Sequence, residues 1–254
     1  MAASEPNTWY RTFFDDAYLR VYGHLLTPQR SAIETAFLVR ALSLQPGDRV
    51  LDLCCGHGRH AVTLAQHGLE VTAQDLNPAV LAAAAQRAGA VDASLMVVES
   101  DMRTIPFNGH FDAVINMFTA FGYFESEAEN QRVLEAVRAA LRPGGRFLVD
   151  LLNRDWLVRN YIPREWWERD GSLYLEERTF DHQTSRNRVR FVVIGSDGAR
   201  EEIPGHDIRV YSLHEMITML SRAGLCFSAV YGGFDGEPYG LETRRMIVVA
   251  RRPD

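Results

Sequence analysis

The chain has few cysteines and no long apolar run, and both absences narrow what it can be. Only three of its 254 residues are cysteine. Cys54 and Cys55 are adjacent and poorly placed to pair with the distant Cys226, so we expect reduced thiols rather than a disulfide framework. No stretch approaches the roughly 20 uninterrupted apolar residues that span a bilayer. Because residues 1–6 also lack the basic and apolar regions of a signal peptide, we expect a cytoplasmic location and no membrane partner.

An excess of positive charge is missing as well. The sequence has 27 lysines and arginines against 33 aspartates and glutamates, which gives a formal net charge of −6. This balance disfavours a large phosphate-contacting surface, and no nucleic-acid partner is expected. No metal site is expected either, because Cys54, Cys55, His57 and His60 match no usual zinc spacing.

What is present is the composition and periodicity of an α/β protein, with 46% hydrophobic and 24% charged residues. From residue 48 to 152, β-rich runs alternate with helical ones, which predicts a doubly wound, mostly parallel Rossmann-like sheet. The predicted strands are 48–54, 69–74, 94–99, 111–117 and 145–152, and the predicted helices are 59–67, 78–88 and 127–141. The local signals are a turn at 143–145, capping boxes at Ser126–Glu129 and Ser212–Glu215, and left-handed glycines after helices at Gly68, Gly89 and Gly224.

The pattern changes after residue 152. Three β-like segments near 172–181, 187–195 and 201–211 predict an inserted antiparallel β subdomain. A helix at 213–223 and β-like runs at 225–231 and 243–251 then return to the core. We therefore expect a helical N-terminal arm or lid at 1–45, a cofactor-binding core at 46–152 and 212–254, and a β-rich substrate-side subdomain at 153–211.

A glycine-rich turn follows the first predicted strand and carries an acid at its entrance. Gly56 and Gly58 let the backbone fold sharply and approach a ligand where a side chain would block it. Asp52, just upstream, would repel the pyrophosphate of a dinucleotide but attract the ammonium or sulfonium of S-adenosylmethionine. This electrostatic argument predicts a methyl-donor site.

The second predicted strand ends at Asp75, which lies 75 − 52 = 23 positions after Asp52. This is close to the ~20 residues expected before an acid that binds ribose hydroxyls. The alternative is a helix cap, but Asn77 and Pro78 already supply an N-cap and a first-turn proline. The same spacing with Gly56-x-Gly58-x-x-Ala61 fits a dinucleotide fingerprint, so an NAD-dependent oxidoreductase is the alternative function.

Taken together, these residues resemble the class I S-adenosylmethionine-dependent methyltransferases, from about Asp48 to Leu152 and again in the C-terminal strands. The resemblance implies that Asp101 and Met102 meet the adenine, and that the stretch from Asn116 to Phe124 lines the methyl-transfer cleft. That stretch looks like its counterpart in small-molecule methyltransferases, including amino-sugar N-methyltransferases. The candidate cofactor-binding residues are Tyr10, Asp52, Cys54, Gly56, Gly58, Asp75, Leu76, Asp101, Met102, Asn116 and Phe118.

The expected reaction moves a methyl group to a nitrogen or oxygen of a small-molecule acceptor, in a monomer or homodimer. Tyr123, near the end of the cleft segment, and His206 are the candidate catalytic residues, with packing as the alternative role for each. Arg244 and Arg245 suggest either contact with an acidic substrate or a solvated strand end. A protein that binds S-adenosylmethionine without turning it over is a further alternative, which the sequence leaves open.

Overall fold

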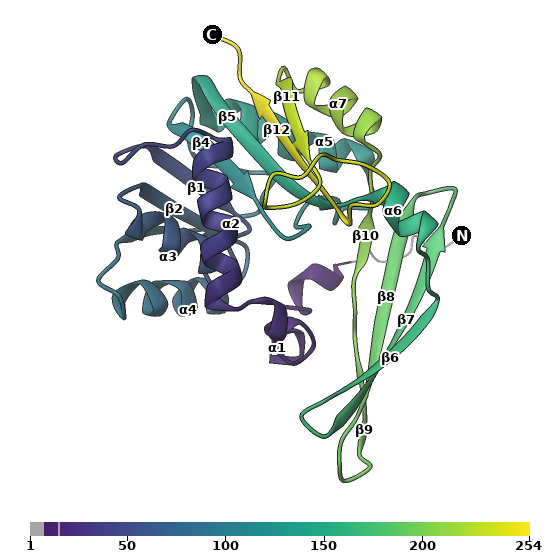
Figure 1. Ribbon diagram of the computed structural model, residues 1–254. Helices are drawn as coiled ribbons and strands as arrows, with labels where there is room; N and C mark the ends of the chain where they lie inside the picture. Colours follow the sequence, from purple (N-terminus) through teal and green to yellow (C-terminus); the bar gives the residue numbers. More distant parts are fainter. Residues whose placement is uncertain (1–7, 15) are drawn as a thin grey trace.

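Two β-sheets organise the molecule, one wrapped by helices and one projecting beside it (Figure 1). The computed structural model describes residues 8–14 and 16–254. The larger sheet has the strand order β11-β12-β5-β4-β1-β2-β3. Its strands are β1 (Arg49–Leu53), β2 (Glu70–Asp75), β3 (Leu95–Glu99), β4 (Phe111–Asn116), β5 (Leu141–Leu152), β11 (Cys226–Tyr231) and β12 (Arg245–Arg251).

The sheet is parallel from β3 to β5, and β12 joins β5 in antiparallel register. The predicted doubly wound, mostly parallel sheet is thereby confirmed. Its strand order reverses at β1, which lies between β2 and β4. Ligands of such sheets bind at the carboxyl ends of the strands where this reversal occurs. The loops after β1 and β4 are therefore the place to look for a site.

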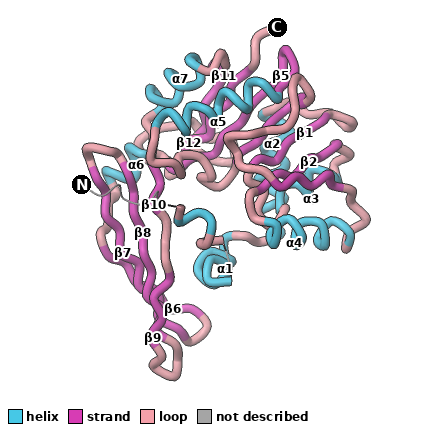
Figure 2. Tube along the Cα trace, turned by 180° about the vertical axis from the view of Figure 1, so that it is seen from behind, coloured by secondary structure: helices cyan, strands magenta, loops and turns pink. Residues whose placement is uncertain are grey.

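Helices cover both faces of this sheet. One core cluster packs the side chains of α5 and α7 against one face, and a second cluster packs α2, α3 and α4 against the other. Figure 2 shows α5 and α7 together on the face turned toward the viewer. These helices are α2 (Pro28–Ala41), α3 (Arg59–Gln66), α4 (Pro78–Gly89), α5 (Glu127–Ala140) and α7 (Leu213–Arg222).

The smaller sheet is antiparallel, in the order β10-β8-β7-β6, with β9 also paired to β8. Its strands are β6 (Arg164–Arg169), β7 (Ser172–Asp181), β8 (Arg186–Ile194), β9 (Arg200–Ile203) and β10 (Asp207–Arg209), and α6 (Arg154–Arg159) precedes them. The predicted strand at 201–211 is therefore wrong as one unit. Pro204 has no N–H to donate, and Gly205 lies so close to the Val189 carbonyl that no side chain fits there.

Several local predictions are wrong for identifiable reasons. The Ser126 side chain makes no capping hydrogen bond, and Gly89 belongs to α4 with a negative φ. Pro143-Gly144-Gly145 lies within β5, at an irregularity in its pairing with β4, instead of forming a separate turn. The capping box at Ser212 and Glu215 and the left-handed Gly68 and Gly224 are confirmed.

The N-terminal segment crosses between the two sheets. It contains the short 3-10 helix η1 (Trp9–Arg11), α1 (Asp16–Tyr22) and a second 3-10 turn, η2 (Gly23–Leu25). Val21 of α1 packs with Tyr174 and Phe191 of the antiparallel sheet. Among the described residues, no helix combines the length and apolar character needed to cross a bilayer.

Candidate active site

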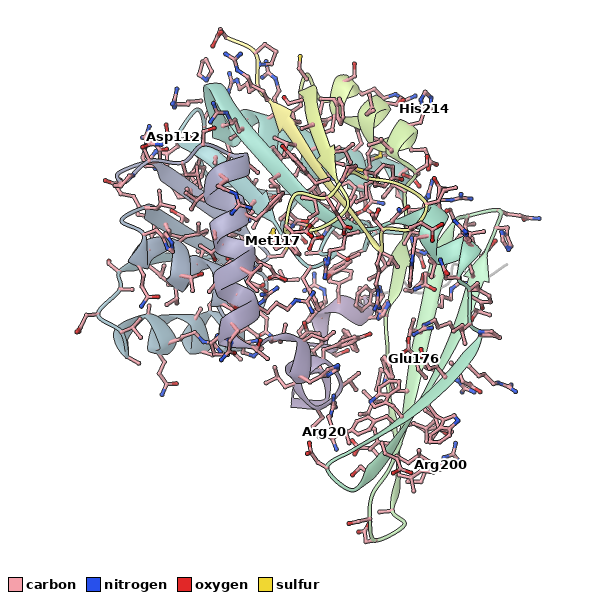
Figure 3. The ribbon with its side chains drawn as sticks, in the orientation of Figure 1. Arg20, Asp112, Met117, Glu176, Arg200 and His214 are labelled. Carbon is pink, nitrogen blue, oxygen red and sulfur yellow. The ribbon has the colours of Figure 1, made fainter. Side chains whose placement is uncertain are left out.

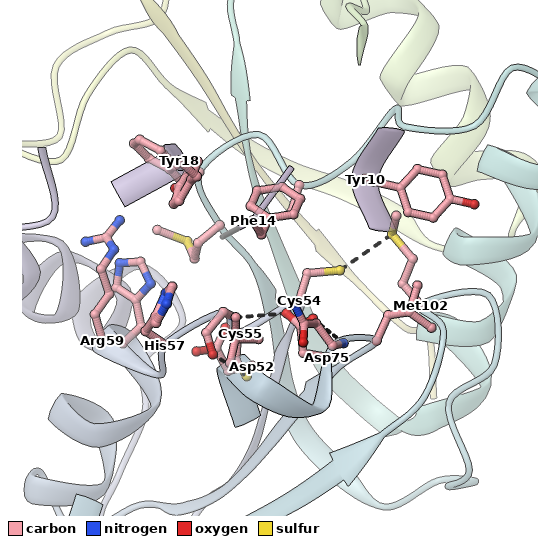
Figure 4. Close-up of a pocket in the computed structure, with 18 of the residues that line it drawn as sticks. Tyr10, Phe14, Tyr18, Asp52, Cys54, Cys55, His57, Arg59, Asp75 and Met102 are labelled. Carbon is pink, nitrogen blue, oxygen red and sulfur yellow. Dashed lines mark hydrogen bonds between the residues drawn. The ribbon is translucent and has the colours of Figure 1, made fainter. Parts of the chain in front are cut away.

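A cavity of about 470 Å³ opens at the carboxyl ends of β1 to β4. The loops after all four strands line it, and the aromatic N-terminal segment closes it from the other side. Figure 4 shows Arg59 and His57 at one end, Tyr10 and Met102 at the other, and Asp52, Cys54 and Asp75 along its floor. The cavity therefore has two chemically different ends.

The turn after β1 takes its shape from left-handed backbone at Cys54, Gly56 and Gly58. Gly56 lines the cavity, and its N–H donates to Asp75 Oδ2 over 2.9 Å. Gly58 has a different role, because a Cβ there would lie 2.7 Å from the Cβ of Ala84 in α4. Gly58 thus lets two helices approach, and it is not among the residues that line the cavity.

Asp75 ends β2, and its carboxylate is held by two backbone N–H groups. Besides Gly56, the Asn77 N–H donates to Asp75 Oδ1 over 3.0 Å. Asn77 itself caps α4, with Pro78 in the first turn, as the sequence predicts. Asp75 is therefore not the helix cap, and burial raises its pKa. Each oxygen keeps a lone pair with which to accept from a ligand hydroxyl.

Two buried charged groups at the Arg59 end lack full partners. Asp52 is 1% exposed, and its Oδ2 has no hydrogen-bond partner among the described residues. The Nη2 of Arg59 is likewise buried and unpartnered in that part of the chain. Burial raises the pKa of Asp52 to about 7. Leaving such groups unpaired is costly, and a ligand with both an ammonium and a carboxylate satisfies both.

Arg59 is held in place by a network beneath the cavity. Its Nη1 donates to Glu34 Oε2 on α2, and His60 Nε2 lies 2.7 Å from the same oxygen. Arg30 Nε donates to Glu34 Oε1 over 2.8 Å. Burial alone would raise the pKa of Glu34, but His60 and Arg59 lower it to about 2. A permanently ionised carboxylate therefore fixes the orientation of the Arg59 guanidinium.

The opposite end of the cavity is flatter and more apolar. The Sγ of Cys54 lies 3.7 Å from the Sδ of Met102, and both side chains line the cavity. Asp101 follows β3, and both its oxygens accept hydrogen bonds from the Arg103 side chain. Although burial opposes it, the contact with Arg103 lowers the pKa of Asp101. A planar group over Met102 would find an ionised acceptor at its edge.

Aromatic rings cover the cavity. The ring of Tyr10 stacks on Tyr123 at a centroid separation of 6.1 Å, and Phe14 stacks on the same ring at 6.0 Å. Burial raises the pKa of Tyr123 well above its usual value, so its phenol stays protonated near neutral pH. His206 does not line the cavity, and its ring packs among Trp9, Phe13 and Tyr22. Burial lowers the pKa of His206 to about 4, so its imidazole is neutral.

Phe118 lines the cavity from a strained backbone position. Both Phe118 and Thr119 have positive φ, at 59° and 60°. The N–H of Phe118 donates to Asp150 Oδ2 over 3.0 Å, and the N–H of Thr119 donates to the Asp150 carbonyl. Arg245 Nη1 pairs with the same carboxylate over 2.6 Å. Strain of this kind persists where surrounding contacts over-determine it, often at a functional site.

The sequence-predicted residues divide into two groups. Those that line the cavity are Tyr10, Asp52, Cys54, Gly56, Asp75, Leu76, Asp101, Met102, Phe118 and Tyr123. Gly58, Asn116 and His206 do not line it, and the Asn116 amide instead donates to the Leu53 carbonyl over 3.0 Å. The sequence analysis did not name Arg59, which lines the cavity, or Glu34, which holds it. The only signal in the loop was a cation directly after Gly58.

Comparison with known proteins agrees with this geometry. Residues 50–145 match the model of a methyltransferase domain. The chain is 27% identical to the cypemycin N-terminal methyltransferase of a Streptomyces species, over 81% of this chain and 84% of that one. It superposes on the amino pentose methyltransferase CalS10 of Micromonospora echinaspora, solved with S-adenosylmethionine bound, at a TM-score of 0.71 and 25% identity, covering 94% and 98% of the two chains. Residues 50–145 therefore carry a methyltransferase domain, and the relatives and solved structures support a class I S-adenosylmethionine-dependent methyltransferase.

A further solved structure extends the likeness of this methyltransferase beyond its core. The CcbJ methyltransferase of Streptomyces caelestis superposes at a TM-score of 0.83 with 21% identity, over 96% of this chain and 99% of that one. At that identity the likeness speaks only for the fold, and it includes the antiparallel sheet because nearly the whole chain is covered. The oxidoreductase alternative finds no support among these three proteins.

The buried carboxylate of Asp52, whose Oδ2 has no partner among the described residues, predicts a specific pH dependence of ligand binding. A ligand ammonium favours ionised Asp52, so binding releases the proton that Asp52 carries below its free pKa of about 7. Affinity for S-adenosylhomocysteine should therefore fall about tenfold between pH 8 and pH 6, measured by calorimetry. The Asp52→Asn variant should bind weakly without this dependence. A flat profile for the unmodified chain would contradict the assignment.

Proposed function

We propose that this methyltransferase transfers the methyl group of S-adenosylmethionine to a nitrogen or oxygen of a small-molecule acceptor. The observation that carries the donor assignment is the pair of buried unpartnered atoms, Asp52 Oδ2 and Arg59 Nη2, beside a cavity that Cys54 and Met102 line farther from Arg59. The α-ammonium and α-carboxylate of the donor match this pair in charge. The acceptor class is supported by relatives whose names describe methylation of the N-terminus of cypemycin and of amino sugars.

Different residues of the chain would bind different parts of the donor. Asp52 would bind the ammonium, Arg59 the carboxylate and Asp75 the ribose hydroxyls, while Met102 and Asp101 would contact the adenine. The bound donor supplies an electrophilic methyl group on a sulfonium. In-line displacement depends mainly on alignment, so the principal task of the protein is to hold donor and acceptor in one geometry.

The N-terminal arm, the 116–124 segment and the antiparallel sheet would form the acceptor side. Tyr123 would contact the acceptor as a protonated phenol and hydrogen-bond donor. His206 has a neutral imidazole and contacts Tyr22, which in turn contacts Phe118 on the cavity wall. The His206 imidazole would take a proton from a methyl acceptor that extends past Tyr22.

Purified protein freed of carried-over ligand tests this function directly. We expect calorimetric binding of S-adenosylhomocysteine and transfer of labelled methyl groups from S-adenosylmethionine into a fraction of a metabolite extract, with mass spectrometry identifying the product. The Asp52→Ala variant is the inactive control. Binding of a nicotinamide dinucleotide without any response to S-adenosylhomocysteine would overturn the proposal.

A further inference from the structure

Arg244, immediately before β12, has a side chain that makes no hydrogen bond or ion pair with any residue the structure describes. Its guanidinium carbon lies 5.4 Å from the ring centroid of Trp156 on α6. Its carbonyl accepts a hydrogen bond from the Asn153 N–H over 3.0 Å. Asn153 also caps α6 and donates to the Gly240 and Thr243 carbonyls. The Trp156 ring thus contacts the guanidinium, and the hydrogen bond from Asn153 fixes the backbone of Arg244. No described carboxylate forms an ion pair with the guanidinium.

The carboxylates near Arg244 are engaged by other arginines. Glu176 Oε1 accepts from Arg178 Nε over 2.6 Å, and Arg178 also pairs with Glu165. The Asp150 carboxylate is taken by Arg245. Figure 3 places Glu176 on the antiparallel sheet, below Met117, which marks the end of β4 in that view. Arg244 is therefore a third guanidinium beside two whose partners are already in use.

The charges around Arg244 leave its own positive charge uncompensated. Arg244 keeps access to solvent, yet partial burial lowers its pKa, and the charges of Arg245 and Arg178 lower it further. Glu176 and Tyr22 act in the opposite direction without offsetting this. An anion bound at Arg244 would relieve the repulsion between the guanidinium groups.

Ring and charge contacts connect the surroundings of Arg244 to the wall of the donor cavity. The ring of Phe118 lines the donor cavity and contacts Arg245 at 5.6 Å and Tyr22 at 6.4 Å. The charge of Arg244 is among those that act on Tyr22. Tyr22, on which the charge of Arg244 acts, and Phe118, which lines the donor cavity, thus lie between Arg244 and the donor cavity.

We propose that Arg244 binds an anionic group of the methyl acceptor, a carboxylate or a phosphate, and so selects acidic small molecules. This assignment rests on the proposed function. An aromatic face beneath the guanidinium and two donor edges free for bidentate bonding suit either anion. The acceptor's nucleophile would then extend past Tyr22 toward Phe118 and the donor.

Matched pairs of amines test the assignment. The probes are glycine against glycinamide, and O-phosphoethanolamine against ethanolamine, each titrated into protein with and without S-adenosylhomocysteine and followed by the indole N–H signal of Trp156. We expect the anionic member of at least one pair to bind roughly 10-fold or more tightly than its neutral partner. The pair that shows the preference identifies the anion.

The Arg244→Gln variant should lose this preference, Arg244→Lys should keep part of it, and Arg222→Gln, on the exposed end of α7, should keep all of it. Equal binding within both pairs, no binding by any probe, or a preference that survives in Arg244→Gln would each overturn the assignment. S-adenosylhomocysteine affinity serves as the fold check for every variant. If the unmodified chain does not bind it, the proposed function fails, and the titrations without it still decide whether Arg244 is an anion site.

Discussion

The Arg59→Gln variant is expected to bind S-adenosylhomocysteine about 10- to 100-fold more weakly than the unmodified chain and to bind 5′-methylthioadenosine with unchanged affinity. The two ligands share adenine, ribose and sulfur, and only the first carries the amino-acid tail. Arg59 Nη2 is buried and unpartnered at the end of the cavity opposite Met102 (Figure 4). A substitution at that end should therefore weaken the binding of S-adenosylhomocysteine alone.

The magnitude follows from the kind of bond that is lost. Hydrogen bonds to charged groups contribute about 1.5–3 kcal/mol, and each 1.4 kcal/mol corresponds to a factor of about ten in affinity. The fold should survive the substitution, because Glu34 retains its contacts with Arg30 and His60. Calorimetry with both ligands gives the affinities, and the melting temperature checks the fold.

Two further variants sharpen this experiment. Arg59→Lys keeps the charge but loses the planar donor set, and its affinity should be intermediate. Arg40→Gln, at an exposed position on the same helix as Glu34, should bind both ligands like the unmodified chain. Equal weakening of both ligands by Arg59→Gln would mean that Arg59 supports the cavity as a whole, and the carboxylate assignment would then be wrong.

The sheet and its helices were predictable because their signals are local. Apolar runs of strand length alternate with amphipathic segments between residues 48 and 152, and β1 to β4 begin and end within about two residues of the predicted runs. Predictions were poorer where tertiary packing decides the backbone. At Gly205, the approach of the Val189 carbonyl interrupts a segment that alternates like one strand.

The candidate site divides in the same way. Asp52 and Asp75 lie at the ends of β1 and β2 and Gly56 follows β1, at a spacing typical of such sites, so the sequence alone suggests their roles. Arg59 gives no such signal, because its support comes from Glu34, which lies 25 positions earlier on a helix of its own. The sequence offers Arg244 and Arg245 alike for an acidic substrate, and only the assembled fold distinguishes them, because Arg245 pairs with Asp150 and Arg244 has no ion-pair partner among the described residues.

The second large effect is expected from Gly122→Ala, at the junction between the core and the antiparallel sheet. Gly122 has a φ of 95°, and its carbonyl accepts the Arg209 N–H of β10 over 2.8 Å. A Cβ at this position would overlap the Arg209 carbonyl oxygen. Left-handed backbone costs a non-glycine residue roughly 1–2 kcal/mol, and overpacking adds about 1–3 kcal/mol. We expect the free energy of unfolding to fall by about 2–5 kcal/mol.

Gly47→Ala separates the two contributions to this loss. Gly47 has a similar φ of 90°, but a Cβ there would meet nothing within 4 Å, so only the backbone cost applies. Thermal unfolding should show a clearly larger drop in melting temperature for Gly122→Ala, roughly 2–4 °C for each additional kcal/mol in a chain of this size. Gly122→Ala should also lose methyl transfer, because the 116–124 segment that carries Phe118 and Tyr123 would separate from β10. Equal melting temperatures for the two variants would show that the backbone angle alone accounts for the loss at Gly122 and that the junction tolerates displacement.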